Sequence, residues 1–163
     1  DFILNAMFVY CLDYYDRLFH TKTDSETIKL KLKEKFYDSK KGVFSMSTEN
    51  RESSVLCNSL AVLVGISTSE SEKNLLRKKN MIDVSLSMNS FYYDAIKKIG
   101  NGAEKIILKD IKKQYGGMIK KSATTFWETI KGKDDFNGTG SLCHGWSALP
   151  VYYLNVLCKN EKE

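Results

Sequence analysis

The sequence predicts an all-α fold in which deeply buried helices alternate with amphipathic ones. Three observations predict it: proline occurs once in 163 residues, strand-type alternation is almost absent, and apolar residues recur at helical spacing along the chain. With 42% hydrophobic and 12% aromatic residues, the chain has the size of one ordinary domain and enough apolar surface to bury a core. We therefore expect about seven helices in a single domain.

The first part of the chain contains both helix types. Phe2 to Leu12 is apolar on all sides, which predicts a helix buried all round. A capping-box spacing, Thr23-x-x-Glu26, then opens a helix to about Tyr37 whose narrow apolar stripe lies among lysines, so we expect solvent on most of its sides. Val55 to Val64 is again apolar all round, and Gly65 stands where it would end that helix.

The alternation continues to the C-terminal part. Ser69-x-x-Glu72 is a second capping-box spacing, before a polar helix, and Phe91 to Ile99 is aromatic and apolar. Gly100-Asn101-Gly102 predicts a turn, and the lysine-covered helix after it has a stripe made of Ala103, Ile107 and Ile111. Val151 to Leu157 returns to the buried type.

About four inner and three outer helices result, and this layering is typical of an α/α toroid or an α-solenoid. The buried helices begin near residues 1, 53, 88 and 146. These unequal gaps argue against a repeat of fixed length, so a toroid with long loops fits better.

Composition excludes several classes of function. The net charge is +5, but Lys and Arg are spread along the chain among acids, which indicates a solvated surface and not a nucleic-acid interface. No apolar run reaches the length of a membrane span, and the N-terminus has no signal-peptide pattern, so we expect no membrane, no secretion and a cytoplasmic location. The four cysteines are Cys11, Cys57, Cys143 and Cys158. They lie far apart in the sequence and have no metal-ligand spacing, so we expect reduced thiols, no metal and no cofactor.

Four loops precede the inner helices, and in a toroid such loops open at the same end. They span 45–54, 83–90, 122–128 and 140–146. They contain hydroxyls and amides together with His144, Trp127, Trp146 and Glu128. Flat aromatics and many hydroxyls suit a sugar, and a carboxylate there can orient a water for attack on an anomeric carbon. The alternative from the same residues is that Thr124, Thr125 and Glu128 cap a helix turn while the tryptophans belong to the core.

Two of these loops also carry a family resemblance. Ser122-Ala-Thr-Thr-Phe-Trp-Glu128 resembles the G-A-T-T-x-W-E segment of bacterial α-L-rhamnosidases, and Ser141-Leu-Cys-His-Gly-Trp-Ser-Ala148 resembles their S-L-x-H-x-W-S-A segment. Upstream, Asn58 to Ile66 is similar to the N-A-L-A-V-L-x-G-I helix of that family, and Tyr115-Gly-Gly-Met118 to its W-G-x-M turn. The resemblance covers nearly the whole chain.

The resemblance implies an inverting glycoside hydrolase with an (α/α)6 barrel of six helical hairpins. It implies that Glu128 is the general base and that His144 binds sugar hydroxyls, with Trp127, Trp146 and Thr125 as further substrate-binding residues. Two departures are local: Ser122 replaces the usual Gly, and Leu86 to Asn89 lacks an expected Pro.

The third departure is length, because about seven helices are present where a closed barrel has twelve. The general acid of the family lies in an acidic segment of the earlier half, and no such segment precedes the first helix here. We therefore expect residues 1–163 to be the C-terminal half of a rhamnosidase-like barrel that needs its missing N-terminal half, and uncovered apolar sides of the first helix to favour self-association.

Three functions stay open at this point. The first is hydrolysis of terminal α-L-rhamnosides when the barrel is completed. The second is a catalytically inactive sugar-binding remnant that keeps His144 and the tryptophans. The third is an α-helical interaction scaffold.

Overall fold

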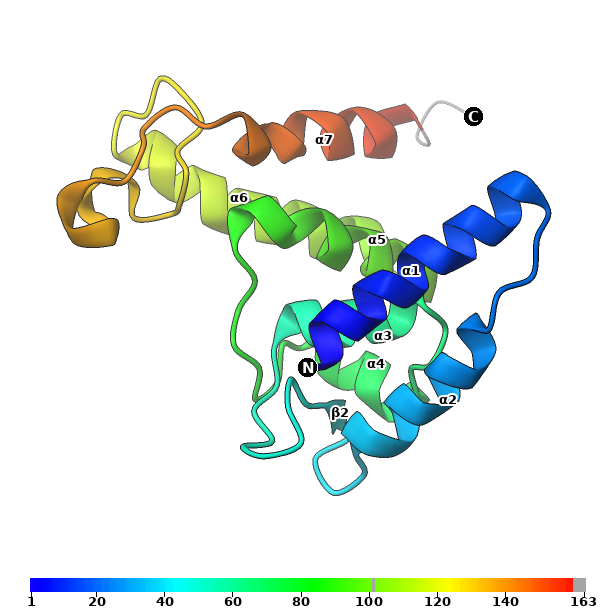
Figure 1. The fold of residues 1–163 in the computed structure, drawn as a ribbon. Helices are drawn as coiled ribbons and strands as arrows, with labels where there is room; N and C mark the ends of the chain where they lie inside the picture. The colour runs from blue at the N-terminus through cyan, green and yellow to red at the C-terminus, as the bar shows by residue number, and fades with distance from the viewer. Residues whose placement is uncertain (101, 160–163) are drawn as a thin grey trace. The chain divides into compact units, whose positions relative to one another are not determined.

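The computed structural model describes residues 1–100 and 102–159, and its seven α-helices in that range confirm the all-α prediction (Figure 1). The helices are α1 (Phe2–Phe19), α2 (Ser25–Phe36), α3 (Val55–Leu63), α4 (Ser69–Leu76), α5 (Asn89–Ile99), α6 (Ala103–Lys120) and α7 (Leu149–Lys159). Four short 3₁₀ segments join them: η1 (Leu86–Met88), η2 (Gly132–Asp134), η3 (Phe136–Gly138) and η4 (Gly145–Ala148). The turn expected at Gly100-Asn101-Gly102 includes Asn101, which lies outside the described residues.

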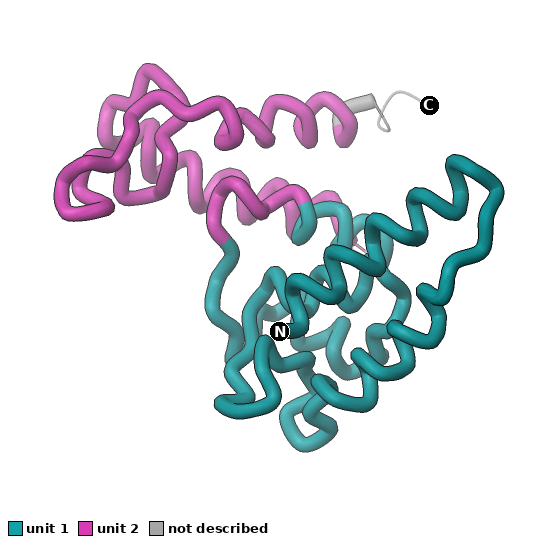
Figure 2. Tube along the Cα trace, viewed as in Figure 1, with its two compact units in different colours: residues 1–84, 91–99 teal, residues 85–90, 100–163 magenta. Residues whose placement is uncertain are grey.

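The chain forms two compact units, shown in different colours in Figure 2. Unit 1 consists of residues 1–84 and 91–99, and unit 2 of residues 85–90 and 100–163. We describe each unit by itself.

The core of unit 1 is built where α1 packs against α2 and α3. The Phe2 ring lies 5.5 Å, centroid to centroid, from the rings of both Phe36 and Phe44. The prediction that the first helix is buried all round is wrong for the described residues, because α1 buries one face, through Phe2, Ala6 and Val9, and leaves others open to solvent. The helix has packing partners on that side alone, so its further apolar residues stay uncovered.

Unit 1 also contains a small hairpin that the sequence did not predict. Strands β1 (Tyr37–Asp38) and β2 (Val43–Phe44) pair antiparallel, with Tyr37 opposite Phe44. The Asp38 carboxylate accepts hydrogen bonds from the backbone N–H groups of Lys40 and Lys41 and so holds the turn. Strands of two residues are too short to show alternation in the sequence.

Both expected capping boxes are wrong in detail. The Thr23 hydroxyl donates to Asp16 at 2.8 Å instead of capping a helix, and α2 begins at Ser25 without a side-chain cap. At α4 the box is formed one residue earlier than expected, by Thr68 and Ser71. In the first case a carboxylate seven residues upstream competes for the hydroxyl, which a local spacing rule does not consider.

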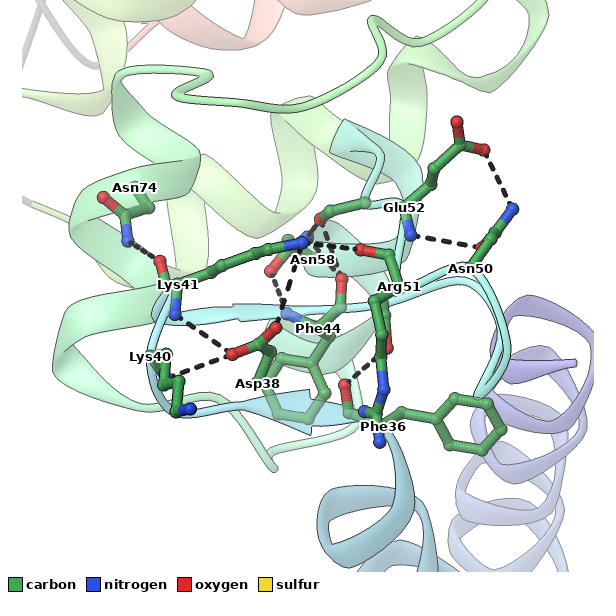
Figure 3. Close-up of polar contacts among 12 residues, drawn as sticks. Phe36, Asp38, Lys40, Lys41, Phe44, Asn50, Arg51, Glu52, Asn58 and Asn74 are labelled. Carbon is green, nitrogen blue, oxygen red and sulfur yellow. Dashed lines mark hydrogen bonds and ion pairs between the residues drawn. The ribbon is translucent and has the colours of Figure 1, made fainter.

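The prediction for α3 is confirmed: the helix is buried on nearly all sides, and Gly65 follows it with a positive φ of 81°. Its buried Asn58 joins the helix to β2, as Figure 3 shows. The Asn58 side-chain oxygen accepts the Phe44 N–H at 2.9 Å, and its amide group donates to Phe44 O, Ser53 Oγ and Ser54 O. The hydrogen bonds of the Asn58 side chain, which we call the Asn58 hub, fix the hairpin against α3.

Unit 2 contains α6 and α7, which pack together. The narrow stripe expected on α6 is confirmed, with Ile107 and Ile111 buried and extended by Tyr115 and Met118. The buried type expected for Val151 to Leu157 is wrong for the described residues, because Tyr153 and Leu157 are buried while Val151, Tyr152 and Leu154 are exposed. The side of α7 that faces away from α6 has no cover in this unit.

Candidate functional site

Two segments that are separated in sequence lie side by side in unit 2. The Glu128 N–H donates to Ser141 O at 2.9 Å, and the His144 N–H donates to Phe126 O at 2.8 Å. The Thr125 hydroxyl adds a bond to Leu142 O. We call residues 125–128 and 141–144 the paired segments; they hold most of the residues that the sequence marked as functional.

Glu128 joins the paired segments through its side chain as well as its backbone. Its half-buried carboxylate accepts the Ser141 N–H at Oε2, at 3.1 Å. No helix includes or begins at Glu128, so it is not the helix-turn cap of the alternative interpretation. Its other oxygen, Oε1, has no hydrogen bond to any residue in the described ranges.

The connection between the paired segments depends on two glycines. Gly132 has a positive φ of 63°, and a Cβ atom there would lie 2.6 Å from Trp127 Cε3. A Cβ atom at Gly140 would lie 2.0 Å from the Gly132 carbonyl oxygen. Trp127 is consequently 8% exposed, with Gly132 against its six-membered ring. The close approach of glycine backbone and indole sets the course of the loop that returns the chain to Ser141.

A cavity of about 470 Å³ lies beside the paired segments within unit 2. Its lining is largely apolar and comes from the end of α6 and from both segments: Tyr115, Met118, Ile119, Ala123, Thr124, Thr125, Phe126, Cys143, His144 and Gly145. Two buried polar atoms on lining residues, the Tyr115 hydroxyl and His144 Nδ1, have no hydrogen-bond partner among the described residues. Buried polar groups are normally paired, so these two atoms are available to a ligand or to water.

Tyr115 is 6% exposed. Burial, and then the negative charge of Asp110, raise the pKa of the Tyr115 phenol to about 12. The group is therefore a neutral hydroxyl at ordinary pH and can both donate and accept a hydrogen bond.

His144 and Trp146 form a stacked pair next to the cavity. Their ring centroids are 3.8 Å apart and the ring planes differ by 25°. Trp146 is 47% exposed. An exposed indole near unpaired polar atoms can stack on the C–H face of a sugar ring.

The structure distributes the sequence-predicted residues unevenly around this cavity. Thr125 and His144 line it, Trp146 stacks on His144, and Glu128 and Trp127 are not among the lining residues. The segment of residues 85–90 also comes close, because η1 lies beside η4. The loop of residues 45–54 belongs to unit 1, so its convergence with the others stays a prediction.

Tyr115, Met118 and Phe126 are among the lining residues that sequence reasoning did not mark as functional. On α6 the first two continue the apolar stripe, and this spacing indicates core as readily as a site. The W-G-x-M resemblance at Tyr115 was the available signal.

Neither a metal cluster nor a membrane-spanning helix occurs among the described residues. No group of three or more His, Cys, Asp or Glu side chains there is arranged to hold a metal ion. None of the helices in that part of the chain combines the length and apolarity needed to cross a bilayer. The described thiols are free, with Cys57 buried and Cys11 and Cys143 exposed, and the Cys158 side chain lies outside the description.

Comparison with known proteins gives a match in structure. No protein-family model and no curated protein matches the sequence. The structure is similar to a rhamnosidase from Klebsiella oxytoca solved with rhamnose bound, with a TM-score of 0.77 at 19% sequence identity. The fold is of the rhamnosidase type. The match covers 93% of this chain and 33% of that chain, so the fold is part of an all-α toroid and spans about a third of the rhamnosidase's length.

Proposed function

We propose that this chain is the base-bearing part of a glycoside hydrolase that acts on terminal α-L-rhamnosides by inversion. The observation that carries the proposal is the position of Glu128: its carboxylate is held by the Ser141 N–H inside the paired segments, whose other end carries His144 beside the cavity. The similarity to a rhamnosidase with rhamnose bound supports the choice of sugar.

In this proposal Glu128 removes a proton from the attacking water. Oε2 is engaged by Ser141, which orients the carboxylate, and Oε1 is the oxygen that receives the proton. His144 Nδ1 and the Tyr115 hydroxyl supply polar contacts to sugar hydroxyls, and Trp146 supplies an aromatic face. Thr125 and Trp127 remain predicted substrate-binding residues.

An inverting glycosidase also needs a general acid, with the two carboxyl groups roughly 6.5 to 9.5 Å apart. Within the paired segments Glu128 is the sole carboxylate. We propose that the acid comes from a further part of the toroid, which agrees with the chain's match to about a third of the rhamnosidase. Without that part, the chain alone is expected to bind sugar but not to hydrolyse it.

The first test measures sugar binding by residues 1–163 alone. L-Rhamnose titrated into ¹⁵N-labelled chain should shift the indole signal of Trp146 at millimolar concentration, and the two tryptophans give two indole signals that Trp146→Phe assigns. His144→Ala should weaken binding, whereas His20→Ala, at an exposed site of unit 1, should not. A shift of the second indole signal would support a contact with Trp127. If no signal moves at high rhamnose concentration, this chain contains no rhamnose site.

The second test measures catalysis in a hybrid in which this chain replaces the matching third of the Klebsiella oxytoca rhamnosidase. Glu128→Gln should reduce turnover of an aryl α-L-rhamnoside by about 10²- to 10⁴-fold, the usual value of general-base assistance, and should leave sugar binding nearly unchanged. Asp134→Asn is the control for loss of a nearby carboxylate. Azide, which needs no deprotonation, should restore part of the rate and give the β-linked rhamnosyl azide. Turnover within a few-fold of the parent hybrid would refute the role of Glu128.

The second candidate function is an inactive sugar-binding remnant. The observation that favours it is the cavity with two unpaired polar atoms next to a single carboxylate. Rhamnose binding by the chain, together with a hybrid that binds rhamnose but does not hydrolyse the aryl α-L-rhamnoside, would support it.

A further inference from the structure

Two fully buried polar side chains of unit 2 lack a hydrogen-bond partner and do not line the cavity. Asn89, which ends η1 and begins α5, and Ser147, within η4, are both 0% exposed. Neither Asn89 Oδ1 nor Ser147 Oγ bonds to any group in the described part of the chain. The chain itself encloses both side chains, so their burial does not depend on any further part of a toroid.

A chain of hydrogen bonds from α6 determines which end of the Asn89 amide is unpaired. The Asp110 carboxylate accepts from Gln114 Nε2 at 2.5 Å, and Gln114 Oε1 accepts from Asn89 Nδ2 at 3.1 Å. An ionised carboxylate can only accept hydrogen bonds, so it orients the Gln114 amide, which in turn orients the Asn89 amide. The unpaired atom of Asn89 is therefore its carbonyl oxygen, which needs a donor.

The two unpaired atoms come from segments that lie against each other. The 3₁₀ segments η1 and η4 are in contact, yet Asn89 Oδ1 and Ser147 Oγ do not bond to each other. Buried polar groups are almost always paired, and an internal water can pair two or more of them at once. We propose that one internal water molecule donates to Asn89 Oδ1 and bonds to the Ser147 hydroxyl, and so links α6 to η4 through Asn89.

This water makes Asn89 a positioning residue for the segment that carries His144 and Trp146. His144 is the N-cap of η4, and its carbonyl oxygen accepts the Ser147 N–H at 3.2 Å. Trp146, in the same turn, stacks on His144. A link at Ser147 therefore restrains both rings, and the bond from the His144 N–H to Phe126 O extends this restraint to one end of the paired segments. The effect on sugar binding rests on the proposed function, whereas the water site does not.

A crystal structure of residues 1–163 at a resolution that shows ordered waters tests the site directly. One water should lie within hydrogen-bond distance of both Asn89 Oδ1 and Ser147 Oγ. In Asn89→Leu, which keeps a side chain of similar size without its polar atoms, that water should be absent. A direct bond between the two atoms, a separate protein partner for each, or no water between them would overturn the proposal.

Hydrogen exchange in the full chain tests the link to the paired segments. Asn89→Leu and Ser147→Ala should each accelerate exchange at the His144 amide about ten-fold, because each removes one partner of the water. The double variant should exchange no faster than either single variant, since both act through the same water. Exchange at the Ser141 amide, which donates to Glu128 at the other end of the paired segments, should stay nearly unchanged. Ser85→Ala, which removes an exposed hydroxyl next to η1, is the control and should change neither amide.

Three outcomes of these measurements would refute the positioning role. They are additive effects of the two replacements, an unchanged His144 amide, and equal acceleration at the His144 and Ser141 amides, which would indicate a general loss of stability in unit 2. With L-rhamnose as the probe, Asn89→Leu should raise the dissociation constant about three- to ten-fold, and an unchanged constant would refute the effect on the sugar site. If the parent chain binds no rhamnose, the proposed function fails, while the crystal structure and the exchange rates still decide whether the water site exists.

Discussion

Replacement of Asn58 should loosen unit 1 by an amount that follows from its hydrogen bonds. The side chain is 1% exposed and makes four hydrogen bonds (Figure 3). Two of them join α3 to Phe44 of β2, and the other two reach Ser53 and Ser54 before the helix. In Asn58→Ala the Phe44 carbonyl keeps its bond from the Ser53 hydroxyl at 2.8 Å, and the Ser54 carbonyl keeps the bond from the Asn58 N–H. The Phe44 N–H, however, loses its acceptor.

The magnitude combines one orphaned donor with a small cavity. A buried unsatisfied N–H costs about 1 to 3 kcal/mol, and the lost side-chain volume brings the total to about 2 to 4 kcal/mol. Hydrogen exchange at the Phe44 amide should therefore accelerate by about 30- to 700-fold, at 1.4 kcal/mol per tenfold. Urea unfolding monitored on unit 1 signals should show the same loss.

Two further variants sharpen this prediction. Asn58→Asp keeps an acceptor for the Phe44 N–H but turns a carboxylate towards the carbonyls of Phe44 and Ser54, so it should destabilise at least as much as alanine. Asn50→Ala, in the exposed loop of the same unit, should change stability by less than about 0.5 kcal/mol. If the Phe44 amide stays protected from hydrogen exchange in Asn58→Ala, the Asn58 hub does not hold the hairpin and the prediction is wrong.

Two other predictions concern the loop of the candidate site and the turn after α1. Gly132→Ala should destabilise unit 2 by about 2 to 4 kcal/mol, because it adds left-handed strain to a clash with Trp127. Gly138→Ala, at a position with φ 89° and open space around it, should cost about 1 kcal/mol. Equal losses of stability for the two variants, measured by tryptophan fluorescence during urea unfolding, would contradict this prediction. The bonds from the Thr23 N–H and from the Thr21 and Thr23 hydroxyls lower the pKa of the Asp16 carboxyl below its ordinary value, so their stabilising effect is present above about pH 4 and is lost as pH falls through the lowered pKa. In the parent chain, hydrogen exchange at the Thr23 amide, corrected for its intrinsic pH dependence, should accelerate in that acidic range. In Asp16→Asn the same exchange should be fast and independent of pH. If the Thr23 amide is as well protected in Asp16→Asn as in the parent, the carboxylate does not have this role.

The sequence predicted the helical class because the side on which a helix is apolar is a local property. It succeeded for α3 and α6, where all-round and narrow apolar patterns match the observed burial. The prediction failed for α1 and α7. An apolar side indicates that a helix packs against another element, but it does not indicate that this element lies within these residues. Val151 and Leu4 are exposed for that reason.

The limits at the candidate site have a similar cause. The motifs marked Thr125, Glu128 and His144, but no spacing rule gives the hydrogen bond from Ser141 to a carboxylate thirteen residues earlier. The cavity could not be predicted either, because Tyr115, one of its lining residues, has the spacing of an ordinary core position on α6. Long-range pairing and the volume between segments depend on backbone paths that local patterns do not encode.

The bond between Ser141 and Glu128 determines what a substitution at Glu128 can reveal. A carboxylate that served only to join the segments would act through Oε2, and the glutamine of Glu128→Gln can accept the same N–H with its carbonyl oxygen. That substitution then puts an NH₂ group, which cannot take a proton, at the position of Oε1, the oxygen without a partner among the described residues. The join between the segments should survive while the capacity to accept a proton is lost. A large fall in turnover with unchanged exchange at the Ser141 amide would therefore report chemistry at Oε1, and faster exchange at that amide would report a structural failure instead.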